Sequence, residues 1–368
     1  MKGKFPLSIM IWLSGLMIPV SLTAQNIFKV IIRDDSAVLT EIGKNVYVII
    51  HNDATDEWPH GNTGVLVGDK NICIIDATYL PSRSKKDIKL IKQISSKPVK
   101  YLVFTHWHFD HNNGTISYLD EYPDIKIISE KETADFIHIN GIWWSRSSTT
   151  FNSNKRKSLQ KLEEQLSAGK DTSGKEFSDS AKSSLSKTIE QRKNELAELK
   201  DLKVVKPNTV FSNEMTVDLG NMVVLFKDWG KANSPHDVSV YIPKMQIFFT
   251  GDILVESPLP FVGASWPVTW VTCLRKIGQM QTKIIVPGHG PVMNNKEYLH
   301  QFEHFLDESI KRVTAMIFDG KTLIEAQHAN FDDLRRGPWK RADVTDEDWN
   351  YIISTLVERI WKSVRGQG

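Results

Sequence analysis

Residues 103–114 read Val103-Phe-Thr-His-Trp-His-Phe-Asp-His-Asn-Asn-Gly114 and place three of the chain's 11 histidines within six positions. An apolar run up to Phe104 predicts a short buried strand, and the residues from Asn112 to Gly114 break the pattern before a short helix. Imidazole suits zinc, and an aspartate adds an oxygen ligand or a base. The segment therefore predicts a turn that points metal ligands into one pocket, with a chance grouping on a solvated loop as the alternative. The candidate ligands are His106, His108, Asp110 and His111.

The spacing His-x-His-x-Asp-His resembles the metal-binding signature of the metallo-β-lactamase fold superfamily. Further motifs follow the order of that family at residues 61–76, 230–252 and 284–291. The resemblance covers roughly residues 45–295 apart from an insertion. It implies an α/β fold, namely a four-layer αββα sandwich with an inserted helical hairpin and a helical C-terminal extension. In this family the aspartate that ends the early hairpin, here Asp76, supports the loops of the site rather than binding metal.

The pattern of apolar residues predicts the elements around the first motif. Short β-branched runs predict strands at 46–50, 64–68 and 72–76. Helical spacing over residues 82–94 completes a β-α-β unit that leads into the motif. After the insertion, strands are expected at 209–211, 215–217 and 222–226, and helices at 269–280, 302–317 and 349–364. We expect a main domain over 25–300 and a helical extension over 301–368.

An insertion of about residues 141–206 is rich in Ser, Lys, Glu and Gln. Leucines and an isoleucine recur at helical spacing in two arms, and the glycines at 169 and 174 separate the arms. This pattern predicts a helical hairpin with a narrow apolar stripe on each arm. A solvated surface hairpin is the simpler interpretation. A lid or a contact between two copies of the chain, using Trp143 and Trp144, is the functional alternative.

The resemblance also implies ligands in the second half of the chain. Asp252 ends an apolar run within Thr250-Gly-Asp252 and matches the carboxylate that bridges two metals in the family. His289 lies in Pro287-Gly-His-Gly-Pro291 and matches the late histidine ligand. The chain departs from the family at one position, because Asn233 stands where the third histidine of the first metal site belongs. His236 follows three residues later, so either Asn233 or His236 completes the first site, or that site is weak.

These ligands predict a zinc-dependent hydrolase, and residues 1–24 predict that it is exported. One or two zinc ions would acidify a water molecule and polarise a substrate oxygen, and Asp110 would orient the attacking water. The expected substrate is a small ester, lactone, thioester or amide, β-lactams included. A metal-dependent phosphodiesterase or nuclease of the same fold is one alternative, and a non-catalytic binding protein with a degraded first site is another. The Asn-Ser-Pro-x-Asp turn and the insertion resemble a poorly characterised branch of exported metallo-β-lactamase-like hydrolases.

The composition and residues 1–24 give the expectations on localisation, partners and cysteine pairing. Residues 1–24 combine a basic start, an apolar core and a small-residue cleavage site, which predicts a signal peptide and a periplasmic or secreted protein. An uncleaved membrane anchor is the alternative. The net charge of +2 gives no reason to expect a nucleic-acid partner. The two cysteines, Cys73 and Cys273, either pair or remain as buried thiols. The helical insertion could also support a homo-oligomer.

Overall fold

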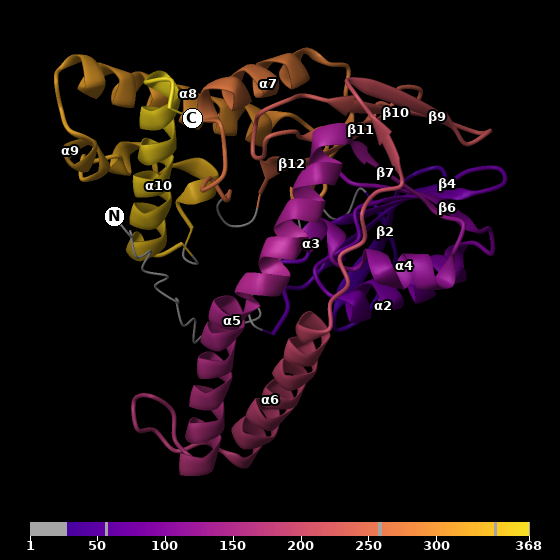
Figure 1. Cartoon of the computed structure of the whole chain (residues 1–368), viewed down its shortest axis with the longest axis horizontal. Helices are drawn as coiled ribbons and strands as arrows, with labels where there is room; N and C mark the ends of the chain where they lie inside the picture. The colour runs from indigo at the N-terminus through magenta and orange to yellow at the C-terminus, as the bar shows by residue number, and fades with distance from the viewer. Residues whose placement is uncertain (1–27, 56–57, 257–259, 342–343, 368) are drawn as a thin grey trace. The chain divides into compact units, whose positions relative to one another are not determined.

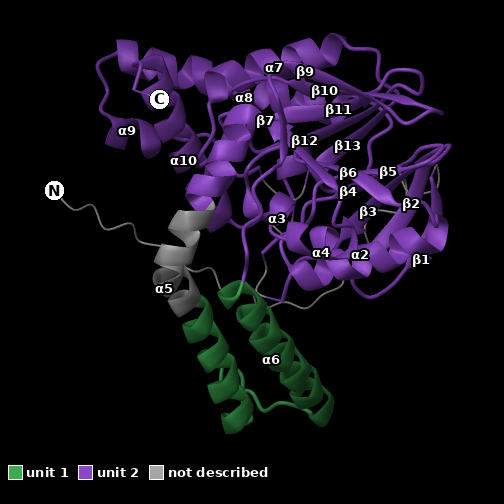
Figure 2. Cartoon of the chain, turned by 45° about the vertical axis from the view of Figure 1, so that its right-hand side comes forward, with its two compact units in different colours: residues 1–27, 142–201 green, residues 28–141, 202–368 purple. Residues whose placement is uncertain are grey.

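The computed structural model describes residues 28–55, 58–256, 260–341 and 344–367, with the backbone alone for 141–154. The chain divides into two compact units, which Figure 2 shows in different colours. Residues 142–201 form a helical unit, and residues 28–141 with 202–368 form an α/β unit. The predicted signal peptide lies outside the described residues. Within the described ranges, no helix has the length and apolar character needed to cross a membrane.

The first sheet has eight strands in the order β1-β2-β3-β4-β5-β6-β7-β8. Neighbouring strands are antiparallel as far as β5, and β5 to β8 are parallel. Helix α2 crosses over between β5 and β6, which confirms the predicted β-α-β unit ahead of the histidine motif. The strand bounds are β1 Lys29–Arg33, β2 Ala37–Gly43, β3 Val46–His51, β4 Thr63–Val67, β5 Ile72–Ile75, β6 Val99–Val103, β7 Lys126–Glu130 and β8 Thr209–Phe211.

The second sheet has five strands in the order β13-β12-β11-β10-β9. Strands β9 to β12 are antiparallel, and β13 returns parallel to β12 after helix α7. All nine residues of β12 are buried, as expected for a central strand covered on both faces. The bounds are β9 Glu214–Asp218, β10 Val223–Asp228, β11 Val238–Ile242, β12 Ile247–Val255 and β13 Ile284–His289.

The α/β unit is layered, with the two sheets packed face to face and helices on their outer faces (Figure 1). Two consecutive residues of β4 show this directly, because they point to opposite faces of the sheet. Val65 packs in the outer cluster under α2 and α4, while Leu66 packs between the sheets. Phe249 of β12 meets Leu66 in that inner core. The αββα sandwich is therefore confirmed. The helices of the outer layers are α2 Pro81–Ile94, α4 Thr115–Glu121, α7 Pro267–Gln279, α8 Glu297–Phe318 and α10 Asp346–Val364.

The C-terminal helices share one hydrophobic cluster with the second sheet. Phe248 and Ile253 of β12 pack in it together with Trp270 of α7, Phe302 of α8 and Trp349 of α10. Residues beyond 300 therefore complete the outer layer of the second sheet. Short elements connect these helices, namely α9 Leu323–Gln327 and the 3-10 turns Asp332–Leu334 and Gly337–Trp339.

The helical unit contains the expected hairpin. Helix α5 runs continuously over Lys131–Ala168, so the first arm begins before the insertion expected from about residue 141. Helix α6, Asp179–Lys200, forms the second arm and begins at Ser178, whose hydroxyl accepts a hydrogen bond from the Ala181 amide. The side chains of Trp143 and Trp144 lie outside the described part. In the α/β unit, Cys73 and Cys273 are both buried free thiols and do not pair.

Candidate metal centre

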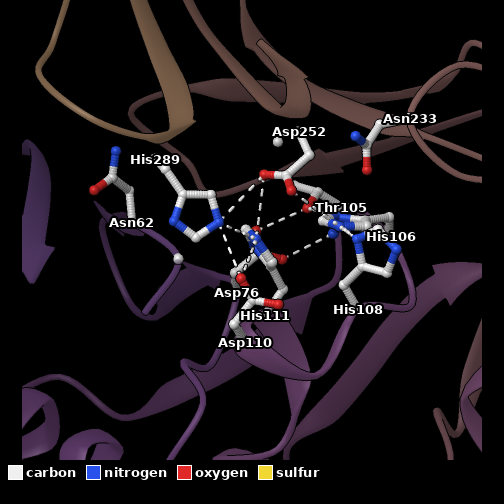
Figure 3. Close-up of polar contacts among 12 residues, drawn as sticks. Asn62, Asp76, Thr105, His106, His108, Asp110, His111, Asn233, Asp252 and His289 are labelled. Atoms are coloured by element: carbon white, nitrogen blue, oxygen red, sulfur yellow. Dashed lines mark hydrogen bonds and ion pairs between the residues drawn. The ribbon is translucent and has the colours of Figure 1, made fainter. Parts of the chain in front are cut away.

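Six of the predicted ligands converge where strands of the two sheets end (Figure 3). The histidine motif follows β6 and enters the short helix α3, Phe109–Asn112. Asp252 lies in β12, and His289 is the last residue of β13. The chain thus brings together side chains that are up to 183 positions apart, all largely buried. The converging residues are His106, His108, Asp110, His111, Asp252 and His289.

The facing atoms form two groups joined by Asp252. In one group, His106 Nε2 lies 2.8 Å from His108 Nδ1 and 3.5 Å from Asp252 Oδ2. In the other, His111 Nε2 lies 3.2 Å from Asp252 Oδ1, and His289 Nε2 lies 3.0 Å from Asp110 Oδ2. The two oxygens of Asp252 therefore face different groups. This arrangement suits a carboxylate shared between two metal ions.

Asp76 orients two of the imidazoles. Its Oδ2 accepts hydrogen bonds from His111 Nδ1 and from the Thr105 hydroxyl, both at 2.8 Å. Because that hydroxyl proton is committed to Asp76, the Thr105 oxygen accepts from His106 Nδ1 at 3.1 Å. Both rings are thereby held with Nε2 toward the cluster, which is the orientation a metal ligand needs. The supporting role that the resemblance implied for Asp76 has a direct geometric basis.

Two glycines make room for the cluster. A Cβ on Gly61 would lie 2.5 Å from Cε1 of the His111 ring, and a Cβ on Gly288 would lie 2.0 Å from Asp252 Oδ1. The segment at Gly61 is also fixed to both halves of the chain, because its amide donates to the Asp110 carbonyl and the Asn62 amide donates to the Gly288 carbonyl. Only glycine lets the backbone approach the ligands this closely.

The charges of the cluster are mutually dependent. Burial alone would raise the pKa of Asp110 and of Asp252, but the neighbouring His111 and His289 lower both, so the two carboxylates are ionised. Burial opposes protonation of His111 and His289, yet the adjacent carboxylates raise both of their pKa values. Burial and the neighbouring His106 lower the pKa of His108 to about 3, so this ring is neutral. A cation bound between the anionic oxygens and the inward nitrogens could replace the protons that these groups share.

Buried polar atoms without hydrogen-bond partners provide a separate test of the fit to a metal. Among the described residues, Asn233 Oδ1 is such an atom, although buried acceptors are normally paired. The set of donors combines imidazole nitrogens with carboxylate oxygens, which divalent metals such as zinc accept. The residues therefore fit a metal centre of one or two ions.

The structure separates the two candidates for the incomplete first group. Asn233 is fully buried and lies beside His106 and His108. His236 does not join them, because Asp228 Oδ2 accepts from its Nδ1 and Glu132 Oε2 accepts from its Nε2, both at 3.0 Å. The hydrogen bond to Asp228 raises the pKa of His236 to about 9. Sequence reasoning left His236 open as a ligand, but its ring is engaged in a separate cluster with Glu130, Glu132 and Asp228.

Several supporting residues were not identified from the sequence. Asn62 lies in the motif at residues 61–76, but the sequence did not indicate its role. Its side-chain amide donates to the carbonyls of Pro287 and Gly290 and so ties this loop to the end of β13. Asp237 is buried, and burial raises its pKa to about 7. Thr105 links Asp76 to His106. In the sequence, Thr105 and Asp237 are marked only by being next to His106 and His236, and adjacency in sequence does not predict a contact.

Comparison with known proteins identifies the family. The sequence model described as Metallo-beta-lactamase superfamily matches residues 56–289. A linear primary-alkylsulfatase of Pseudomonas sp. (strain ATCC 19151) is 22% identical over 247 residues, which cover 63% of this chain. The match covers 42% of that relative, so this chain spans less than half of its length.

Two solved structures share the fold. The structure of TMB-1 is similar with a TM-score of 0.51 and 16% identity, covering 75% of this chain and 99% of TMB-1. The DIM-1 metallo-beta-lactamase is similar with a TM-score of 0.50 and 14% identity, covering 74% of this chain and 98% of DIM-1. With the layered sheets, the ligand cluster and the match over most of the α/β unit, this chain belongs to the metallo-beta-lactamase superfamily.

Proposed function

We propose that this protein is a zinc-dependent hydrolase that attacks a small ester-type or amide substrate with an activated water. The observation that supports it most is the convergence of four histidines and two aspartates into two groups that share Asp252. A carboxylate facing two sets of nitrogens serves no evident packing purpose. Its burial is costly unless it is paired with a positive charge, and a metal ion would supply that charge without protonating the imidazoles.

The residues of the chain have separable roles in this proposal. When bound, zinc would lower the pKa of a water molecule and polarise the scissile carbonyl, phosphoryl or sulfuryl oxygen. His106, His108, His111 and His289 would hold the ions, with Asp252 between them. Asp110 is ionised and is 10% exposed at its side chain, so its carboxylate would help to hold the ion and can accept a hydrogen bond that orients the attacking water. Asp76 would keep the ligand rings oriented throughout.

The substrate class is inferred from the chemistry of the centre, from the alkylsulfatase relative and from the aromatic side chains beside His108. Small esters, lactones, thioesters and amides, β-lactams included, all suit this chemistry. The alkylsulfatase relative adds sulfate esters of linear primary alcohols to the candidates. Aromatic side chains flank the exposed side of the centre, with the Phe261 ring 5.7 Å and the Trp107 ring 4.7 Å from that of His108. Phe261 is 49% exposed, which favours a substrate with an apolar portion.

Hydrolysis of a defined panel tests the proposal. The panel contains a β-lactam, an aryl acetate, a lactone, a thioester, a linear primary alkyl sulfate and a phosphodiester. We expect turnover of at least one ester or amide, its loss after chelation and its return with zinc. Asp110→Asn should lower kcat about 10²–10⁴-fold, while His300→Ala on the exposed face of α8 should not.

The alternatives have their own outcomes in the same assay. Cleavage confined to the phosphodiester would replace the proposal with a phosphodiesterase. A folded protein that binds no metal and turns over none of the panel would instead indicate a non-catalytic binding protein.

Export and self-association are separate proposals. We infer from the residue pattern of 1–24 that the protein is made with a signal peptide and acts in the periplasm or outside the cell. N-terminal sequencing of the protein from its native compartment should then start at Gln25. A homo-oligomer formed through residues 141–206 should revert to a monomer in light scattering when that segment is replaced by a short linker.

A further inference from the structure

Asn233 is held in one orientation by the loop that follows β12. Its Nδ2 donates to the Phe261 carbonyl at 2.7 Å, and the residue is fully buried. A carbonyl cannot donate, so the atom facing it must be the amide nitrogen. The two ends of the amide are therefore distinguished by this hydrogen bond, and the oxygen points the other way.

The amide oxygen of Asn233 faces the rings of His106 and His108 (Figure 3). Among the described residues it has no hydrogen-bond partner. A buried amide oxygen without a donor is unfavourable, and the two rings that it faces offer it none. His106 Nδ1 is engaged with Thr105, and His108 presents Nδ1 to His106 Nε2. An atom that accepts from no donor but lies beside two inward nitrogens suits coordination of a cation.

We propose that the Asn233 amide oxygen completes a half-site with His106, His108 and Asp252, and that this half-site is the weaker and less zinc-selective of the two. The inference rests on the proposed function, since it requires that the cluster hold metal. Its chemistry follows from the donors. A neutral amide oxygen is a harder and poorer zinc ligand than imidazole, whereas oxygen ligands suit Mn²⁺ comparatively well.

The other half-site has a stronger donor set. Asp110, His111 and His289 supply two imidazoles and a carboxylate, and Asp252 adds its second oxygen. This half-site is expected to fill first. The half-site at Asn233 is expected to fill second and to exchange its ion more readily.

Filling of the weaker half-site is coupled to the loop that carries Phe261. The same amide binds the Phe261 carbonyl through nitrogen and faces the half-site through oxygen. The Phe261 ring lies beside His108 on the exposed side of the centre. Occupancy of the half-site should therefore help to fix the position of the Phe261 carbonyl.

Zinc titration against a chromophoric chelator tests the inference on the full mature chain. The wild-type protein should bind two equivalents, one tightly and one more weakly. Asn233→Ala should weaken only the second equivalent, on the order of 10–100-fold. Asn233→His should tighten it. Asn233→Asp should also tighten it, and this variant replaces Asn233→Ala in the test if Asn233→Ala fails to fold.

A manganese measurement separates ligation from a packing effect. With one equivalent of zinc in the tighter half-site, the electron paramagnetic resonance signal of added Mn²⁺ should show binding to the wild type and much weaker binding to Asn233→His. Ser234→Ala is the matched control, because it removes a hydrogen bond to the His236 carbonyl in the same turn without touching the amide of Asn233. It should leave both zinc steps and the Mn²⁺ signal unchanged.

Three results have distinct meanings. If folded Asn233→Ala binds both zinc equivalents as tightly as the wild type, the inference is overturned. One zinc equivalent in the wild type, kept by Asn233→Ala and lost by His289→Ala, also overturns it but leaves a single-metal hydrolase standing. No zinc bound to either half-site would overturn the proposed function itself.

Discussion

The imidazole Nε2 atoms of His111 and His289 lie 3.1 Å apart, although the two residues are separated by 178 positions in the chain. His111 donates through Nδ1 to Asp76, so its Nε2 is the nitrogen that faces inward. The carboxylates of Asp110 and Asp252 flank the pair. Two nitrogens at this distance can share one proton or bind one cation, and the second arrangement also satisfies both carboxylates.

Metal removal should destabilise the protein. A cation that binds only the folded chain at 100 times its Kd stabilises that chain by about 2.7 kcal/mol. Chelation should therefore lower Tm, on the order of 5 °C, and added zinc should restore it. Differential scanning fluorimetry with and without chelator measures the change. His289→Ala should show a smaller chelator effect, and equal Tm values for the wild type in both conditions would contradict a bound cation.

Asp76→Asn should weaken metal binding while the fold is kept. Asp76 has a φ of 63°, a left-handed conformation that asparagine tolerates better than most residues. The amide cannot accept from both His111 Nδ1 and the Thr105 hydroxyl through one anionic oxygen, so both rings lose orientation. We expect a loss of affinity for zinc on the order of 10–100-fold, measured by competition with a chelator. An unchanged affinity with a lowered Tm would mean that Asp76 acts on the fold alone.

The sequence predicted most of the architecture because the relevant signals are local or ordered along the chain. Short β-branched runs marked β4 and β5, and helical spacing marked α2. The run from His106 to His111 follows a strand, so its side chains had to leave the sheet at one edge. The resemblance then supplied Asp252 and His289, and the structure brings both to that edge. Their roles as ligands stay predictions.

Other features depend on contacts that no periodicity records. Asn233 and His236 lie in one turn, and the direction of each side chain is set by distant partners. Phe261 holds the first, while Asp228 and Glu132 hold the second. Helix α5 starts ten residues before the expected insertion because no proline interrupts its sequence.

The stability of the α/β unit should fall as pH rises toward 10, because of His236. Its folded pKa is about 9, above the ordinary value of 6.5, so the stabilisation is full below about pH 6.5 and is lost as pH rises through 9. The ring is partly exposed, so we expect about 1–2 kcal/mol after allowance for solvent screening. Urea unfolding at pH 6 and pH 10 measures it, with His236→Gln as the comparison. Equal pH dependence in the two proteins would show that Asp228 and Glu132 do not stabilise the charged ring.

Gly61→Ala should damage the centre through His111. The added Cβ would lie 2.5 Å from Cε1 and 2.6 Å from Nδ1 of a ring that Asp76 holds in place, so the ring or the loop must move. Overpacking of this kind costs about 1–3 kcal/mol. It should also shrink the fall in Tm caused by chelation, because a displaced ring binds the cation less well.

Gly278→Ala in α7 is the matched control, because its Cβ would meet His300 at 3.2 Å and Leu299 at 3.4 Å, and neither is a candidate ligand. Alanine there removes the entropic disadvantage of a helical glycine, so stability should stay level or rise by about 0.5–1 kcal/mol. The chelator effect should equal that of the wild type. If both alanine variants show the wild-type chelator effect, the close approach of Gly61 to His111 does not position a metal ligand.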